Sequence, residues 1–521
     1  MEHIIATAQR SILSATLLVV LCIGPAQQTV LSQTASVLQT VNTADTFGNT
    51  VTAKVYKIGK AHFVYTGGDN GFLDVFRIGE GGKLAPVERF ELSNGKGPAR
   101  GIVADKIGGT DYLFVGNKGA SSVEVLSIAD DGRLKRVFVM DDTEKTYLGT
   151  VITLQVVHMA ARSYLFVGGL EATPGLSSFE IKADGKLVHV LSVADDETLF
   201  TDGIIGMFTH KIKGRTFLIT GGFMDNGVSS FRVFADGSFE NINNIADNTT
   251  DRYLTGAYPV DGVTLGENHY IIVGHRHHKY YKRGNFIKKK DFIYHGDGVS
   301  VFKVSDLGEL IPHFVLTDDE KTKVSGQTRI EVLKLDDTRA IVAVGTRDDQ
   351  SIQICELTAD GTLSPLGATD VDYPIYYGMA SAIVGGDLYF LAGSVDNAVK
   401  KFFSYRFDLP GISRGDHKSD RVLRHVVSLK YKDETTREQV EEAVREFTDL
   451  QHKIPAIIGL EWGKNNSPEG KSKNFTHCFT LTFKDEKGRE QYLVHAAHLA
   501  LVERVGPLLA DVFVMDYWGK R

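Results

Sequence analysis

The sequence has few cysteines, few prolines and no C-x-x-C pair. Cysteine occurs only at Cys22, Cys355 and Cys478 among 521 residues, which argues against a disulfide framework and excludes a zinc or redox motif of the C-x-x-C kind. Cys355 and Cys478 lie in apolar, strand-like stretches, so we expect both to be small buried hydrophobic residues. Only 12 residues are proline against 53 glycines, which is typical of many tight turns between strands.

The chain also lacks an excess of positive charge. Its formal net charge is −7 and charged residues make up 24%, so no general attraction to nucleic acid or anionic membrane is indicated. Walker loops, dinucleotide fingerprints and Ser-His-Asp triads are not evident, because the glycines lie between strands and do not open helices. The sequence therefore indicates no nucleic-acid partner, and it leaves any cofactor unknown.

Residues 1–26 have the pattern of a secretory signal peptide. A basic start with Arg10 is followed by the apolar run ILSATLLVVLCIG and by Pro25-Ala26. The run is too short for a comfortable membrane span, so we expect no stable span after removal of the signal, although an uncleaved anchor is the alternative. We predict a periplasmic or secreted protein in which residues 27–35 are a polar spacer.

One phrase recurs along residues 36–411. At 163–185 it reads as an apolar strand, a glycine break, an alternating strand and an Asp-Gly turn. The glycine returns about every 50 residues, with one longer step, at seven places: Gly67, Gly116, Gly168, Gly221, Gly274, Gly345 and Gly393. Self-similarity at this period, with four short strands in each unit, predicts a seven-bladed β-propeller.

The first strand of this region predicts how the ring closes. SVLQTVNTADT, at 36–46, matches the outer strand of other units, whereas the seventh unit ends near Gly411 without one. We therefore expect the segment near Val37 to Asn42 to complete the last blade, because an open ring would leave an unpaired sheet edge. Asp-Gly pairs, such as Asp184-Gly185, supply the turns into the outer strands.

Acidic residues follow the outer strands at Asp45, Asp141-Asp142, Asp195-Asp196, Asp247, Asp318-Asp319 and Asp370. They either form a ring of carboxylates that binds cations or hydrogen-bond the backbone of their own turns, and we prefer the second interpretation.

The fifth unit carries a basic insertion from His275 to Asp297. Three explanations are open: pairing with acidic loops, binding of an anionic ligand, and metal capture through its histidines, which lack a fixed carboxylate or cysteine partner. We favour a solvated loop with anion affinity, and we assign no metal site. The candidate binding residues are His275, Arg276, His277, His278 and Lys279.

The repeated phrase LFVGG…GVSVFKV…DG resembles the lactonase-type seven-bladed propellers over about residues 36–411. The resemblance implies the scaffold and, as an activity, lactone hydrolysis. That family's acid, arginine and histidine site is not carried over to residues of this chain.

The sequence changes character after a polar linker at 412–420. Residues 421–521 read strand, helix, two strands, helix, strand, which predicts a ferredoxin-like α+β unit. Thr435, with Glu438 three residues later, predicts a capping box at the first helix. The predicted fold class is therefore multidomain: an all-β seven-bladed propeller followed by an α+β domain.

This second domain resembles the stress-responsive A/B barrel family, in which two ferredoxin-like units pair into a dimeric barrel. The matching motifs are His425-Val-Val-Ser-Leu-Lys430, Glu461-Trp-Gly463, Ser467-Pro-Glu-Gly470, Phe475-Thr-His477, Tyr492-Leu-Val-His495-Ala-Ala-His498 and Asp516-Tyr517. The resemblance implies a homodimer.

Some members of that family are polyketide cyclases that use a Tyr and a His, which correspond here to Tyr492 and His498. Neutral histidine can remove a proton beside a carbonyl, and a tyrosine hydroxyl can hold the oxyanion. A spacing of six residues places the two on different sides of a straight helix, and Ala496 stands where the family usually has proline. His425, His477 and His495 are further candidate residues for this pocket.

Three hypotheses follow. The first is an exported propeller that binds a small-molecule or protein ligand on its loop face and is dimerised by the second domain. The second is an enzyme, either a lactonase-like hydrolase on the propeller or an acid–base site in the second domain. The third is metal capture by the basic insertion. A shared apolar pocket for His425, His477, Tyr492 and His498 would favour the enzyme.

Overall fold

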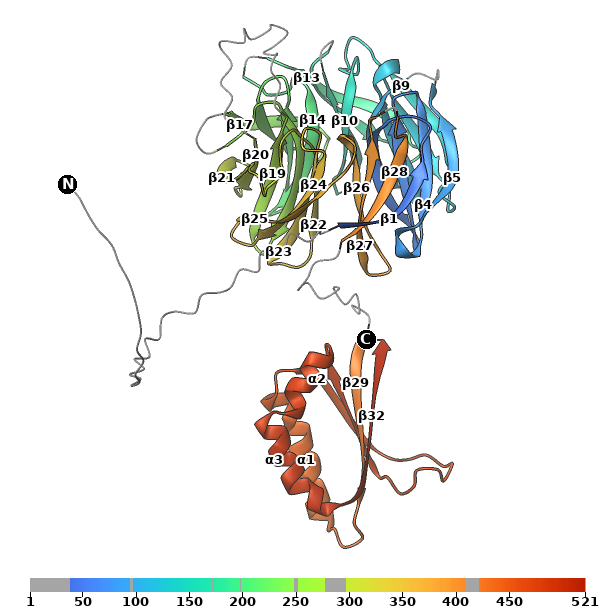
Figure 1. Ribbon diagram of the computed structural model, residues 1–521, viewed down its shortest axis with the longest axis vertical. Coiled ribbons are helices and arrows are strands. Elements are labelled where there is room, and N and C mark those ends of the chain that lie inside the picture. The colour runs from blue at the N-terminus through green and yellow to red at the C-terminus, as the bar shows by residue number, and fades with distance from the viewer. Residues whose placement is uncertain are drawn as a thin grey trace, which may run out of the picture. The chain divides into compact units, whose positions relative to one another are not determined.

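The computed structural model describes residues 38–93, 97–160, 162–170, 173–196, 198–247, 252–276, 297–396, 398–407 and 421–520. The signal peptide, spacer and linker predicted at 1–26, 27–35 and 412–420 lie outside these residues. Seven four-stranded antiparallel sheets occupy 38–407, and one more, with helices on it, occupies 421–520 (Figure 1). The predicted fold class is thus confirmed.

The seven sheets share one strand order, from an inner strand to an outer strand. The inner strands are β2 (Thr50–Ile58), β6 (Ala99–Ile107), β10 (Val151–His158), β14 (Ile204–Ile212), β18 (Ala257–Leu265), β22 (Gln327–Lys334) and β26 (Ile375–Val384). The second strands are β3 (Ala61–Gly68), β7 (Thr110–Asn117), β11 (Ser163–Gly169), β15 (Arg215–Gly222), β19 (Asn268–His275), β23 (Arg339–Thr346) and β27 (Asp387–Ser394). The third strands are β4 (Phe72–Ile78), β8 (Ser122–Ile128), β12 (Gly175–Ile181), β16 (Gly227–Val233), β20 (Gly298–Val304), β24 (Ser351–Thr358) and β28 (Lys401–Phe407). The outer strands are β5 (Leu84–Glu91), β9 (Leu134–Asp141), β13 (Leu187–Ala194), β17 (Phe239–Ala246), β21 (Leu310–Thr317), β25 (Leu363–Asp370) and β1 (Leu38–Asp45).

The blades form a closed ring. Each inner strand contacts the inner strand of the next blade, and β26 of the last blade contacts β2 of the first. The last blade has the order β1-β28-β27-β26, and β1 pairs antiparallel with β28 from Leu38 opposite Phe407 to Asp45 opposite Lys401. The predicted closure by an N-terminal outer strand is therefore confirmed, and it leaves no unpaired edge on that blade's third strand.

The repeated glycines have a packing cause. Each lies at the end of a second strand, where the next blade's inner strand begins. A Cβ on Gly168 would stand 2.6 Å from the Ile204 Cβ, and one on Gly393 would stand 2.3 Å from the Thr50 Cβ across the closure of the ring. A side chain at Gly168 or Gly393 would push neighbouring blades apart, so the sequence period reports the contact between blades.

We expect Gly168→Ala to lower the free energy of unfolding by about 1–3 kcal/mol, because the new methyl group overpacks a rigid contact. The midpoint of chemical denaturation of the full chain measures this loss. Gly79→Ala is the matched control, since a Cβ there meets no atom closer than 3.6 Å. Equal midpoints for both variants would contradict the packing explanation.

The Asp-Gly turns pack on the preceding blade. Gly132, Gly185 and Gly237 have positive φ, the backbone region that favours glycine. A Cβ at Gly237 would stand 2.3 Å from the ring of Tyr164, whose hydroxyl donates to the Ala235 carbonyl at 2.9 Å. Aromatic residues of the second strands thus pack against the turns of the next blade and join neighbouring sheets.

Residues 421–520 form a ferredoxin-like unit. Its elements are β29 (Arg421–Tyr431), α1 (Arg437–Lys453), β30 (Ile457–Lys464), β31 (His477–Phe483), α2 (Glu486–Leu493), α3 (Ala496–Val505) and β32 (Leu509–Lys520). The sheet order is β30-β31-β29-β32, and the helices cover one face of the sheet (Figure 1). Phe447 of α1 stacks on Phe479 of β31 at a centroid distance of 4.0 Å, in the core between helix and sheet.

Two predictions about this unit are corrected. The capping box is formed by Thr436 and Gln439, one residue later than predicted, because Thr435 instead donates its hydroxyl to the Leu508 carbonyl. Cys478 is exposed, since it lies on the sheet face opposite the helices, whereas Cys355 is buried as predicted. Within the described ranges, no helix is long and apolar enough to cross a membrane.

Candidate functional site

An apolar pocket of about 520 Å³ lies between the helices and the sheet of the C-terminal domain. Its walls come from β29, the three helices and β32, and include Val427, Phe447, Leu501, Val505, Val512 and Val514. Three polar side chains predicted as site residues line the same space: His425, Tyr492 and His498. The volume suits a small organic molecule.

A break between two helices brings Tyr492 and His498 together. Tyr492 is in the last turn of α2, His498 is in the first turn of α3, and their ring centroids are 4.2 Å apart. The break forms although Ala496 replaces the usual proline, because the His495 side chain caps α3 by accepting the Ala497 N–H at 3.1 Å. Convergence therefore needs no proline here.

His498 has a defined tautomer. Its Nδ1 lies 3.0 Å from the Leu493 carbonyl, which can only accept, so Nδ1–H donates and Nε2 carries the lone pair. Burial, and in smaller part the nearby His425, lower the pKa of His498 below its ordinary value, although the bond to Leu493 opposes the shift. His498 is thus neutral, with a basic nitrogen, at pH 7.

We expect the pKa of His498 in the folded protein to lie below 6.5, its ordinary value. Because the folded state disfavours the protonated ring, the contribution of His498 to stability is complete above pH 6.5 and decreases as the pH falls below it. Other titratable groups that line the pocket are His425, Tyr492 and Asp511. NMR titration of ¹³C-labelled histidine, with the urea-unfolded chain as reference, measures the shift; a folded pKa at or above the unfolded one would contradict it.

His425 is held by a chain of charged groups. Its Nδ1 donates to Asp516 Oδ1 at 2.6 Å, and Asp516 Oδ2 accepts from Arg489 Nη1 at 2.7 Å. Although burial alone would raise it, the bonds from His425 and Arg489 hold the pKa of Asp516 below its usual value. This arrangement orients the imidazole toward Tyr492, whose ring is 5.5 Å away. The sequence motif contained Asp516, but nothing in it indicated Arg489.

Tyr492 is a buried hydroxyl donor. Burial raises its pKa, so the hydroxyl keeps its proton across the physiological range. Among the described residues, no protein group accepts a hydrogen bond from it. The hydroxyl is therefore available to a ligand in the pocket.

The other two predicted histidines of this domain lie apart from the pocket. His477, at the start of β31, stacks on Trp462 and meets the Tyr431 ring edge to face. It lines a separate hollow with Phe475 and Phe513. His495 acts as the helix cap. The structure thus brings together three of the five candidate residues of the domain.

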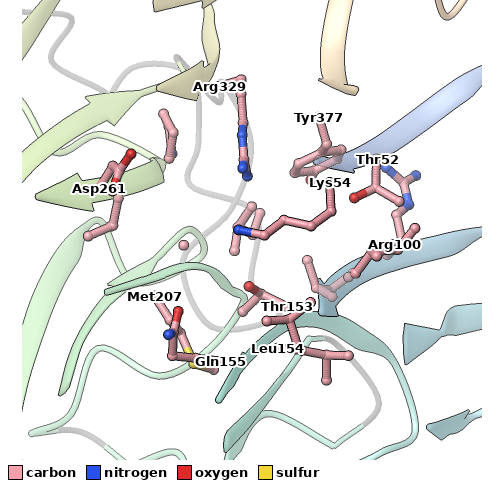
Figure 2. Close-up of a pocket in the computed structure, with 18 of the residues that line it drawn as sticks. Thr52, Lys54, Arg100, Thr153, Leu154, Gln155, Met207, Asp261, Arg329 and Tyr377 are labelled. Carbon is pink, nitrogen blue, oxygen red and sulfur yellow. The ribbon is translucent and has the colours of Figure 1, made fainter. Parts of the chain in front are cut away.

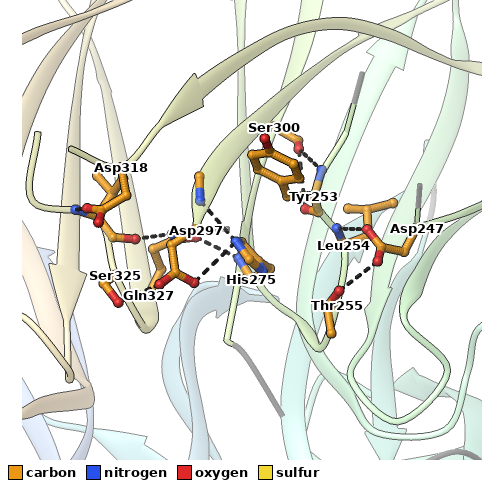
Figure 3. Close-up of polar contacts among 12 residues, drawn as sticks. Asp247, Tyr253, Leu254, Thr255, His275, Asp297, Ser300, Asp318, Ser325 and Gln327 are labelled. Carbon is orange, nitrogen blue, oxygen red and sulfur yellow. Dashed lines mark hydrogen bonds and ion pairs between the residues drawn. The ribbon is translucent and has the colours of Figure 1, made fainter. Parts of the chain in front are cut away.

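On the propeller, His275 is a buried residue of the blade interior (Figure 3). Its Nε2 accepts a hydrogen bond from the Gly298 N–H at 3.0 Å, and its backbone N–H donates to Gln327 Oε1 at 2.6 Å. These two bonds join three strands of two blades. Arg276 donates to the Tyr376 hydroxyl at 2.8 Å. His277, His278 and Lys279 lie outside the described residues, and within the described ones no group of three His, Cys, Asp or Glu could hold a metal ion.

Most of the acidic residues after the outer strands cap their own turns, whereas Asp45 and Asp370 pair with Lys401 and Lys323. Asp247 accepts the Leu254 N–H and the Thr255 hydroxyl, and Asp318 accepts the Val324 N–H (Figure 3). Asp142 accepts the Leu148 N–H in the same way. These contacts agree with the preferred interpretation of the acidic repeat.

Comparison with known proteins places the second domain. The family described as stress responsive A/B barrel domain matches residues 423–518. Olivetolic acid cyclase of Cannabis sativa is 30% identical over 100 residues, 19% of this chain and 99% of the relative. The stress-response A/B barrel domain-containing protein HS1 of Arabidopsis thaliana is 30% identical over 95 residues, 18% of this chain and 87% of the relative.

Three solved structures are also similar. A protein of Arabidopsis thaliana is 29% identical with a TM-score of 0.18, covering 18% of this chain and 92% of its own. A dimeric ferredoxin-like protein from Jannaschia sp. is 24% identical with a TM-score of 0.18, covering 18% and 97%. A protein from Lactobacillus plantarum is 12% identical with a TM-score of 0.42, covering 64% and 85%. With its motifs, its sheet order and two relatives covered almost end to end, the chain belongs, through its C-terminal domain, to the stress-responsive A/B barrel family.

Proposed function

We propose that the pocket of the C-terminal domain is an active site that uses acid–base chemistry on a small apolar carbonyl compound. The observation that carries the proposal is the contact between the Tyr492 and His498 rings inside one apolar pocket. An apolar wall with few polar groups selects an apolar molecule and leaves those groups to orient it. This shared pocket favours the enzyme hypothesis over a C-terminal domain that serves dimerisation alone.

The chemistry follows from the protonation states. His498 Nε2 takes a proton from the carbon next to a carbonyl, the C–H electron pair moves into the carbonyl, and the Tyr492 O–H donates to the resulting enolate oxygen. The enolate carbon then attacks a second carbonyl carbon of the same molecule, and His498 returns the proton to the new alkoxide. This sequence closes a ring without any net loss or gain of atoms. The similarity to olivetolic acid cyclase supports such a reaction class.

We further propose that this domain forms a homodimer. The edge strand β32 pairs only with β29 among the described strands and has 12 residues. Val512, Phe513, Val514, Met515 and Tyr517 are about half exposed along it. A long apolar edge strand of this kind favours pairing with another chain, and a second copy offers the same apolar surface.

The test uses the full chain and 2-tetralone, an apolar ketone with an activated methylene group. In D₂O, the protein is expected to accelerate exchange of the methylene protons, which ¹H NMR follows. An exchange rate equal to that in buffer, for 2-tetralone and for a panel of aromatic ketones and diketones, would contradict the acid–base proposal.

The remaining hypotheses stay predictions. The propeller is proposed to bind a ligand or partner, and the protein is proposed to be exported; N-terminal sequencing of the mature protein checks the export. Lactone hydrolysis on the propeller is checked by assaying a lactone panel.

A further inference from the structure

The inner strands of the propeller surround a cavity of about 250 Å³ (Figure 2). Six charged or amide side chains line it, namely Lys54, Arg100, Gln155, Asp261, Arg329 and Glu331. Lys54 of β2 and Arg329 of β22 extend into the middle of the cavity. No histidine lines the cavity among the described residues, so its chemistry differs from an acid, arginine and histidine site.

The two acids of the cavity neutralise only part of its positive charge. Arg329 is paired with Glu331 at 2.6 Å, and Glu331 also accepts from the Ser381 hydroxyl. Asp261 accepts the N–H groups of Gly262 and Val332, both at 2.8 Å. Burial and the charge of Glu331 raise the pKa of Asp261 to about 7, so this carboxyl is only partly ionised at neutral pH.

The other two cations lack a carboxylate partner. Lys54 forms no ion pair or hydrogen bond within the part of the chain that the structure describes. Arg100 lies over the rings of Tyr376 and Tyr377, at 5.2 and 5.1 Å, and its Nε and Nη1 are buried without a hydrogen-bond acceptor. The Arg100 guanidinium thus lies beside the tyrosine rings and points away from the ammonium group of Lys54 (Figure 2), which leaves Lys54 and Arg329 as the cations in the middle of the cavity.

We propose that the propeller cavity binds a small oxyanion, a carboxylate or a phosphate, held by Lys54 and Arg329 in the middle of the cavity. Lys54 has no carboxylate partner, Glu331 is paired with Arg329, and Asp261 is only partly ionised, so the cavity keeps positive charge for an anion to offset. Guanidinium groups match the geometry of carboxylate and phosphate oxygens. The volume lies below the roughly 300–1,000 Å³ of sites for drug-sized ligands, which indicates a small molecule. This proposal is independent of the C-terminal pocket.

Isothermal titration of the full chain at low ionic strength tests the site, with inorganic phosphate and citrate as separate probes that distinguish the two oxyanions. We expect at least one probe to bind. Lys54→Gln and Arg329→Gln are each expected to weaken binding by at least tenfold, and Lys54→Arg is expected to keep most of it. Lys57→Gln, which removes the same charge from an exposed position of β2, should bind as the wild type does.

Three results would overturn the proposal: no binding of either probe, binding that Lys54→Gln leaves unchanged, or binding that is lost only when Lys288, Lys289 and Lys290 of the basic insertion are replaced by glutamine. Thermal melting of each variant without ligand shows whether it is folded. If Arg329→Gln does not fold, the result for Lys54→Gln decides.

Discussion

Replacing His498 by asparagine is expected to lower the protein-catalysed exchange of 2-tetralone protons by about 10²–10⁴-fold, the usual contribution of a general base. Asparagine can still donate a hydrogen bond to the Leu493 carbonyl, so the break between α2 and α3 is preserved while the basic nitrogen is removed. The exchange rate at saturating ketone, measured by NMR, gives the effect. His452→Asn, in the exposed last turn of α1, is the matched control and should exchange at the wild-type rate.

Companion variants separate the roles in the pocket. Tyr492→Phe is expected to lower the exchange rate by about 10²–10³-fold, because the enolate oxygen loses its hydrogen-bond donor. An active His498→Asn variant, combined with an inactive His425→Asn variant, would contradict the assignment and identify His425 as the base. The hydrogen bond between His425 and Asp516 fixes the orientation of the His425 imidazole, as a general base would require.

Met515→Asp is expected to convert the proposed dimer into a monomer, by raising the dissociation constant of the dimer at least 10³-fold. The substitution places an unpaired charge on an apolar edge strand, where a partner would have to bury it. Sedimentation velocity of the full chain over a concentration series measures the mass. Ile311→Asp is a matched control, because Ile311 on the outer strand β21 is apolar and has the same exposure, 47%.

Two outcomes would contradict the dimer. The first is a wild-type chain that sediments as a monomer at every concentration. The second is a Met515→Asp variant that keeps the dimer mass while folded.

The propeller could be predicted because the repeated residues are required both by the turns within each blade and by contact with the next blade. The glycines at Gly168 and its equivalents are required by contact with the next blade, so they recur whatever else changes. The closing strand could be predicted from the one blade that lacked an outer strand. The described part of that strand, Leu38–Asp45, lies within the predicted stretch 36–46.

The candidate site could be predicted only in part. Tyr492 and His498 were found through a family resemblance, whereas spacing along a helix argued against their contact. The cause of the contact, a cap by His495, is a rotamer choice that composition does not report. The capping box was placed one residue early because Thr435 and Thr436 both have an acid or amide three residues later.

The cavity of the propeller could not be predicted from the sequence. Lys54 and Arg329 come from the first and sixth blades, and each is an ordinary surface-type residue in its own repeat. Only the closed ring brings them to one place. Cys478 was placed wrongly because strand alternation alone does not say which face the helices cover.

The pairing of β1 with β28 has a consequence for synthesis on the ribosome. The strand β1 leaves the exit tunnel first, and it can pair only after β28, about 360 residues later in the chain, has been synthesised. Until then six blades stack as an open arc whose two ends both expose strands. The nascent chain therefore depends on whatever shields those ends, and a stalled or truncated product lacking residues 401–407 would leave β1 without its partner strand.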